Sequence, residues 1–337
     1  MQNLISQAHF FVLIIIFAIS LFVLSKSSDK LVDNAVVLSS IWGMSKLIIG
    51  ATVVSLGTTL PELLASVISA IKGNTGFAVG NAVGSIITNT SIVLGAAVLF
   101  GTVCIREDTK KKFNMLLFVC IVLIIPVIIS KMGNENGTLI RPLGYIFLLM
   151  VPAYIIILIR QYKNNPFAFT FDTVFKKESD KTPKVSVTVI MIAFLALLVS
   201  ISASGLVASS VEIASRLGVP DMVISSTLVA FGTSLPEFST AISSVKKNYG
   251  DLCLGNILGA NILNVILVLG ASVIVSSEAV IIPPSFYVVH IPILILILAV
   301  FGFRTYNKTS ENITKKTGIL LILIYAVYLF CNVKSIF

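Results

Sequence analysis

The chain has 337 residues, of which 56% are apolar and only 12% are charged, and its mean hydropathy is +1.02. Soluble domains carry about 25% charged residues, so this composition excludes a water-soluble globule and indicates a membrane protein. The four cysteines are too sparse for a disulfide scaffold, and the net charge of +9 fits basic residues beside membrane spans rather than a nucleic-acid partner.

Ten stretches are long and apolar enough to span a bilayer, which takes about 20 mostly apolar residues in a helix. In chain order they run from Phe10 to Leu24, Met44 to Ile71, Phe77 to Phe100, Phe113 to Ile129, Leu143 to Ile159, Val185 to Ser209, Met222 to Val245, Leu252 to Val275, Ser285 to Phe303 and Gly318 to Cys331. The polar stretch from Arg160 to Lys184 separates five spans from five. The sequence therefore predicts an all-α polytopic membrane protein.

The basic residues assign a side of the membrane to each loop. When the loops alternate between two sides, 18 of the 24 Lys and Arg residues fall on the same side, and the positive-inside rule makes that side cytoplasmic. We therefore expect a multi-pass protein of the cell (plasma) membrane with both termini outside and the 160–184 loop in the cytoplasm. The N-terminus lacks the basic region of a cleavable signal peptide, so the first span is expected to be retained.

An internal repeat relates the two halves. Residues 51–98 and 226–273 align without gaps at an offset of 175 residues, and about 19 of the 48 positions are identical. We expect a first five-helix repeat over 1–161, a linker over 162–184 and a second repeat over 185–337. Because each repeat has an odd number of spans, the second must enter the membrane in the opposite sense. Inverted repeats are typical of secondary transporters, whose substrate site lies near the midplane between the repeats.

Each repeated segment carries a glutamate inside an apolar span. Glu62 and Glu237 end the matching hexapeptides GTTLPE and GTSLPE. A charged side chain at the centre of a membrane helix costs about 2.5 to 3.5 kcal/mol on insertion scales, so two of them at matching positions require a compensating charge. The nearest basic residues lie nine or more positions away in the sequence. A cation is therefore favoured over a structural ion pair.

Prolines and hydroxyls accompany the glutamates. Pro61 and Pro236 lack an N–H, and their rings clash with the carbonyl four residues earlier. We therefore expect them to break the second and seventh helices and to release carbonyls near Gly57 and Gly232. A lone proline in a membrane helix is usually a kink, but the duplication beside a glutamate favours a site. Hydroxyl oxygens on the same turns come from Thr58, Thr59, Thr233 and Ser234.

The next span of each half supplies amides. The segments GNAVGSIITN and GNILGANILN place Ser85 and Asn89 on one helix face, and Ala260 and Asn264 on the matching face. These faces are expected to meet the glutamates. The alternative for the two asparagines and for Ser85 is hydrogen bonding between helices.

A set of carboxylates, hydroxyls, amides and carbonyls suits a hard cation such as Ca²⁺, which takes 6 to 8 oxygen ligands. Soft metals are disfavoured because neither motif contains Cys or His. Two other classes remain as alternatives: a channel with a carboxylate-lined filter, which does not explain an inverted duplication, and an intramembrane enzyme, for which no HExxH or dinucleotide motif is present.

The paired motifs resemble the two alpha-repeats of the sodium/calcium exchanger branch of the calcium/cation antiporter superfamily, and they cover about 50 residues in each half. The resemblance implies an antiporter of prokaryotic type that exchanges Ca²⁺ for Na⁺, with no organic cofactor and with a monomer as the functional unit. It also implies that the first and sixth spans slide across the remaining bundle. The ligands it implies are Glu62, Glu237, the hydroxyls of Thr58, Thr59, Thr233 and Ser234, the side chains of Ser85, Asn89 and Asn264, and the carbonyls of Ser55 and Ala230.

Two positions depart from that resemblance. Similar members often have Ser and Asp where this chain has Ala260 and Asn264, so one hydroxyl and one carboxylate are missing. The pair of neutral amides, Asn89 and Asn264, looks closer to proton-coupled calcium exchangers. Both Na⁺ and H⁺ therefore stay open as the counter-ion.

Overall fold

The computed structural model describes residues 9–133, 137–164, 184–218, 230–307 and 312–334. Its first half contains α2 (Phe10–Trp42), α3 (Lys46–Ile49), the π-helix η1 (Gly50–Val54), α4 (Ser55–Ile71), α5 (Thr75–Thr88), the π-helix η2 (Asn89–Val93), α6 (Leu94–Phe100), α7 (Glu107–Gly133), β1 (Thr138–Leu139) and α8 (Arg141–Asn164). Its second half contains α9 (Val185–Arg216), α11 (Ala230–Gly232), α12 (Leu235–Lys246), α13 (Gly250–Leu263), the π-helix η4 (Asn264–Leu269), α14 (Gly270–Val275), β2 (Val280–Ile281), the π-helix η5 (Phe286–His290), α15 (Ile291–Tyr306) and α16 (Lys315–Lys334).

The predicted all-α polytopic membrane fold is confirmed. Nine helical segments within the described ranges are long and apolar enough to cross a bilayer. The remaining predicted span, 222–245, falls partly on residues outside those ranges, and α11 and α12 are its described part. Most of the expected linker, 162–184, also lies outside the described residues.

The first span is much longer than predicted. The apolar stretch ends at Leu24, yet α2 continues to Trp42 through Lys26, Asp29, Lys30 and Asp33. One face of this second part is buried, including Leu31 and other apolar side chains that pack against α9. Burial of that stripe and the left-handed cap at Gly43 set the length of the helix, so a hydropathy window underestimates it.

The expected helix break at Pro61 takes a different form. α4 continues through Pro61, and the irregular backbone lies before it, in the π-helix η1. There the Tyr154 hydroxyl donates a 2.7 Å hydrogen bond to the carbonyl oxygen of Ala51. A π-helical turn changes backbone pairing without ending the helix, and a side chain from α8 satisfies this carbonyl. At Pro236 the helix does break, because Thr233 and Ser234 form a turn between α11 and α12.

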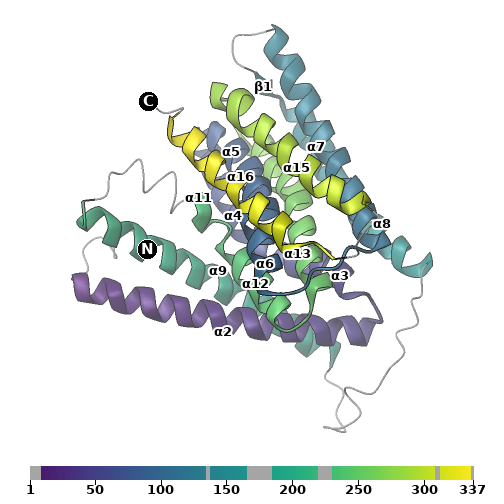
Figure 1. Ribbon diagram of the computed structural model, residues 1–337. Coiled ribbons are helices and arrows are strands. Elements are labelled where there is room, and N and C mark those ends of the chain that lie inside the picture. Colours follow the sequence, from purple (N-terminus) through teal and green to yellow (C-terminus); the bar gives the residue numbers. More distant parts are fainter. Residues whose placement is uncertain (1–8, 134–136, 165–183, 219–229, 308–311, 335–337) are drawn as a thin grey trace, which may run out of the picture.

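α2 and α9 pack closely against each other. They lie side by side along their length, crossing one side of the other helices (Figure 1). Gly205 of α9 approaches α2 so closely that an added Cβ would lie 2.7 Å from Oγ of Ser20. Their apolar side chains form, together with Ile49, Val54 and Leu252 of other elements, a cluster distinct from the larger one. The first and sixth spans are thus one packing unit.

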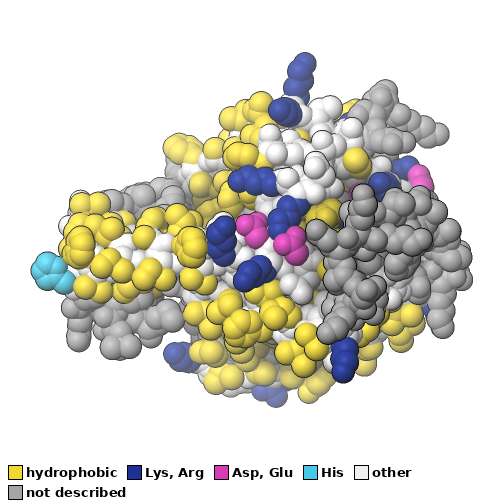
Figure 2. Space-filling view, turned by 90° about the horizontal axis from the view of Figure 1, so that it is seen from below, with side chains coloured by type: hydrophobic (Ala, Val, Ile, Leu, Met, Phe, Trp, Pro, Cys, Tyr) yellow, Lys and Arg dark blue, Asp and Glu magenta, His cyan; other side chains and the backbone are white. Residues whose placement is uncertain are grey.

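Loops that the alternating topology assigns to one side of the membrane do meet in space. On one side, β1 pairs with β2 in antiparallel register, and Arg141 donates to the carbonyl oxygen of Ser276 at 2.9 Å. On the other side, Arg106 forms an ion pair with Asp251. Figure 2 shows basic and acidic side chains next to one another among hydrophobic ones on one face. These contacts join the first half of the chain to the second.

Candidate cation-binding site

Glu62 of α4 and Glu237 of α12 are completely buried. The helices that carry them contact each other. Neither carboxylate forms a salt bridge with any Lys, Arg or His in the described part of the chain, and all four oxygens lack a hydrogen bond of normal geometry. Two buried like charges without a partner are strongly destabilising unless a cation or protons neutralise them.

Three of the four predicted hydroxyl side chains are fully buried. Thr58 lies beside Glu237, although it belongs to the other half of the chain. Thr59 and Ser234 are buried, and their hydroxyl oxygens have no hydrogen-bond partner. Thr233 is half-buried in the turn before α12. Polar atoms that are buried and unpaired are rare in folded proteins and call for an explanation such as an ion.

The predicted amides begin the two matching π-helices. Asn89 is the first residue of η2, and Asn264 is the first residue of η4. Both side chains are fully buried, and Oδ1 of each has no hydrogen-bond partner. The Ser85 hydroxyl, one turn before Asn89, is also unpaired. π-helical turns often occur at functional sites, and here they recur at equivalent positions of the repeat.

At this centre, the glutamate helix of each half contacts the π-helix of the other half. α4, which carries Glu62, contacts η4 of the second half, and α12, which carries Glu237, contacts η2 of the first half. Each glutamate helix therefore meets the amide helix of the other repeat as well as its own. The candidate site belongs to the interface between the repeats.

The two predicted carbonyl ligands, Ser55 and Ala230, lie at the starts of helices. Ser55 begins α4, and its carbonyl oxygen lies 3.3 Å from the Thr58 hydroxyl. Ala230 begins α11. Ala260 is buried in α13, one turn before Asn264, and offers no side-chain oxygen there. The predicted side chains thus lie on elements that contact one another, and their role as ligands, like that of the two carbonyls, stays a prediction.

Two further buried asparagines, Asn256 and Asn261, were not predicted from the sequence as part of this centre. Asn256 donates to Thr240 at 3.0 Å, and its Oδ1 lies 3.3 Å from the hydroxyl of Thr58. Asn261 contacts Asn89 and Thr90. Both are polar residues within an apolar span, and this feature of the sequence could have identified them. Their partners lie on other helices, so the sequence did not indicate what they contact.

The donor set is made of oxygen. Among the described residues no group of three or more His, Cys, Asp and Glu side chains comes together. The centre instead combines two carboxylates with neutral hydroxyls and amides. That combination suits a hard cation such as Ca²⁺ or Na⁺ rather than a soft transition metal.

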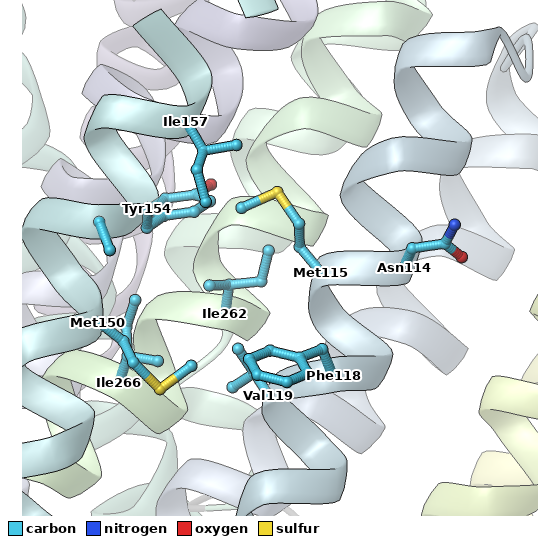
Figure 3. Close-up of a pocket in the computed structure, with 10 residues that line it drawn as sticks. Asn114, Met115, Phe118, Val119, Met150, Tyr154, Ile157, Ile262 and Ile266 are labelled. Atoms are coloured by element: carbon cyan, nitrogen blue, oxygen red, sulfur yellow. The ribbon is translucent and has the colours of Figure 1, made fainter. Parts of the chain in front are cut away.

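A separate pocket between α7, α8 and α13 has a different character (Figure 3). Its walls are Asn114, Met115, Phe118, Val119, Met150, Ala153, Tyr154, Ile157, Ile262 and Ile266. Nearly all of these side chains are apolar, and the Tyr154 hydroxyl is already donated to Ala51. The pocket therefore lacks the oxygen ligands that a cation needs.

Comparison with known proteins assigns the family. The sequence model of the family described as "Sodium/calcium exchanger protein" matches residues 12–162 and 187–334. The putative antiporter CaxA of Alkalimonas amylolytica is 34% identical over 260 residues, which cover 77% of this chain and 79% of that protein. The sodium/calcium exchanger MaX1 of Methanosarcina acetivorans is 28% identical, with 94% of this chain and 97% of that protein covered.

A solved structure agrees with these sequence relatives. The sodium-calcium exchanger NCX_Mj, soaked with Na⁺ and Ca²⁺, superimposes with a TM-score of 0.75 and 26% sequence identity, covering 94% of this chain and 97% of that one. These relatives are transporters, not enzymes. Since the family match covers most of both halves, this chain belongs to the sodium/calcium exchanger family.

Proposed function

We propose that this chain is a secondary active antiporter that exchanges Ca²⁺ for Na⁺ by alternating access, with the ions bound near the membrane midplane between the two repeats. The observation that carries the proposal is the pair of buried carboxylates, Glu62 and Glu237, which have no cationic partner among the described residues. Their helices contact the elements that carry unpaired hydroxyl and amide oxygens. Membership of the exchanger family supports the same activity.

The charge balance accounts for obligatory exchange. Two carboxylates neutralise one Ca²⁺, and removal of that ion leaves two negative charges in a low-dielectric centre. The empty protein should therefore change faces slowly until Na⁺ or H⁺ occupies the site. The extensive packing of α2 against α9 supports movement of this pair as one unit across the other helices, as the step that exposes the site alternately.

The proposed ligands are the side chains predicted from the sequence. Glu62 and Glu237 supply the charge. Thr58, Thr59, Thr233, Ser234, Ser85, Asn89 and Asn264 supply neutral oxygens, together with the carbonyls of Ser55 and Ala230. Hard cations accept such mixed oxygen sets in flexible geometry. No organic cofactor enters this scheme, because the ions are the transported substrates.

A proton-coupled calcium antiporter is the second candidate. It is favoured by Asn264, a neutral amide whose nitrogen and oxygen are both unpaired at the position where a third acid would add charge. With only two acids at the centre, protonation of Glu62 and Glu237 could replace bound Ca²⁺. A channel with a carboxylate-lined filter is a third possibility from a different class.

One experiment separates these candidates. ⁴⁵Ca²⁺ uptake into proteoliposomes is measured with an outward Na⁺ gradient, with an outward proton gradient, and with neither. Na⁺/Ca²⁺ exchange predicts uptake only in the first case, and proton coupling predicts it only in the second. Uptake in all three cases would mean a channel. Liposomes that contain Glu62→Gln protein serve as the control for leakage.

We further propose that the functional unit is a monomer in the cell membrane, with both termini outside and the 160–184 loop in the cytoplasm. The excess of basic residues in one set of loops supports this orientation. Single cysteines placed at Lys72 and at Lys315, in a background without the four natural cysteines, should be labelled by an impermeant maleimide from outside and from inside respectively.

A further inference from the structure

The two amides at equivalent positions of the repeat have different surroundings. Nδ2 of Asn89 donates a 3.2 Å hydrogen bond to Oδ1 of Asn261, and Oδ1 of Asn89 has no partner. In Asn264 neither Nδ2 nor Oδ1 has a partner. Thus one amide is held at its nitrogen, and the other is free at both ends.

The partner of Asn89 is itself fixed. Asn261 is fully buried in α13, and its Nδ2 donates a 2.7 Å hydrogen bond to the Thr90 hydroxyl. Asn261 thus spans from the second repeat to two consecutive residues of η2 in the first. With its nitrogen committed to Thr90, its oxygen is the atom that faces Asn89. An amide whose NH₂ group is held in this way presents its oxygen on the opposite side.

The two repeats differ in sequence at the positions that make these hydrogen bonds. At the offset of 175 residues, Asn261 corresponds to Ile86, and Thr90 corresponds to Val265. Ile86 is completely buried and apolar, so it cannot hydrogen-bond to Asn264. The first half therefore has no counterpart of the chain from Thr90 through Asn261 to Asn89.

We propose that Asn261 is a positioning residue for cation binding: it holds the NH₂ group of Asn89 so that the Asn89 oxygen faces the ion. Asn89 is then a fixed ligand, and Asn264 is an adjustable one. The opposite orientation of Asn89 would place an N–H donor where a cation needs an acceptor. This inference rests on the proposed function, because it assumes that a cation binds between the repeats.

The test is a double-mutant cycle in purified protein with two readouts, equilibrium ⁴⁵Ca²⁺ binding and gradient-driven exchange. Asn261→Leu should raise the Ca²⁺ concentration for half-maximal binding about tenfold, the scale of one lost hydrogen-bonded ligand. Asn89→Ala should have at least the same effect. The double variant should match Asn89→Ala alone, since Asn261 acts only through Asn89. Ile86→Leu, at the equivalent position of the other half, is the matched control and should bind like the wild type.

Several outcomes would overturn the proposal. Unchanged Ca²⁺ binding in Asn261→Leu would do so, and so would effects of the two single variants that multiply in the double variant. If the leucine variant does not fold, Asn261→Ser decides the question, because a serine side chain is too short to reach Asn89 and should give the same rise. Wild-type protein that neither binds nor exchanges Ca²⁺ would refute the proposed function instead, so the two failures are distinguishable.

Discussion

The helix that carries Glu237 and the helix that carries Glu62 each meet the α2–α9 pair, but with different chemistry. α12 is held to α2 by polar contacts: Ser243 donates to the Asp29 carboxylate at 2.6 Å, and Lys247 reaches the Asp29 carbonyl and the Asp33 carboxylate, each at 2.7 Å. α4 meets α9 through a close apolar approach, where a Cβ added at Gly57 would lie 2.6 Å from Cβ of Ala196.

The repeat explains where this difference comes from. At the same offset of 175 residues, Lys247 corresponds to Lys72, while Asp29 and Asp33 correspond to Ser204 and Ala208, neither of which carries a charge. Lys72 is exposed, and it forms no ion pair within the described residues. The two glutamates thus occupy equivalent positions of the repeat, whereas these contacts outside the site have no counterpart. In an inverted repeat the two access states swap the roles of the halves, so a contact present at one end only favours one state.

The largest expected effect on Ca²⁺ exchange comes from substitution of the two glutamates, which occupy equivalent positions of the repeat. Glu62→Gln and Glu237→Gln should each lower gradient-driven Ca²⁺ exchange by more than about 100-fold, because each removes half of the charge that balances the ion. Both proteins should remain folded, as judged by a monodisperse elution profile. Normal exchange in either variant would show that the two halves do not share one site.

Gly57→Ala tests the apolar contact. The added methyl group overlaps Ala196, and overpacking of this kind costs about 1 to 3 kcal/mol. We expect the exchange rate to fall about tenfold, measured with saturating Ca²⁺. Gly80→Ala is the matched control, because a Cβ there meets no atom within 4 Å, and it should exchange Ca²⁺ like the wild type.

Aspartate substitutions at Asn89 and Asn264 should affect ion exchange to different extents. Asn264→Asp adds a carboxylate where no partner is disturbed, and we expect a change of about threefold or more in the Na⁺ or proton concentration for half-maximal exchange, since ligand charge tunes cation affinity. Asn89→Asp would place a carboxylate oxygen against Oδ1 of Asn261 and should be the more damaging change. Equal effects of the two variants on initial uptake rates would contradict the asymmetry described above.

The smallest effect is expected from loss of the ion pair between Asp33 of α2 and Lys247, which follows α12. Asp33→Asn removes one ion pair of Lys247 that is partly exposed, and such pairs contribute about 0 to 1 kcal/mol. The balance between the two access states should shift about twofold to fivefold away from the state that joins α2 to α12. Distances between spin labels on α2 and α12 would report this shift, and Lys110→Gln, which breaks the exposed pair with Glu107, is the control. An unchanged distance distribution would show that the contact does not bias the states.

Much of the fold and of the site followed from local sequence signals. Hydropathy located the membrane spans, and the duplicated hexapeptide located Glu62 and Glu237, because buried acids and prolines are rare inside apolar spans. The full length of α2 did not follow, since its second part is amphipathic and depends on packing against α9. The contacts of Asn256 and Asn261 depend on how the repeats pack together, which no local pattern encodes.

The π-helices at Asn89 and Asn264 have a consequence for how this sequence can vary. A helix that accommodates one extra residue turns everything after it by about 100° relative to an uninterrupted α-helix. Loss of a single residue between 90 and 93, or between 265 and 269, would leave the loops intact but rotate α6 or α14 to a new face. In these two short segments, insertions and deletions are therefore expected to be less tolerated than most substitutions.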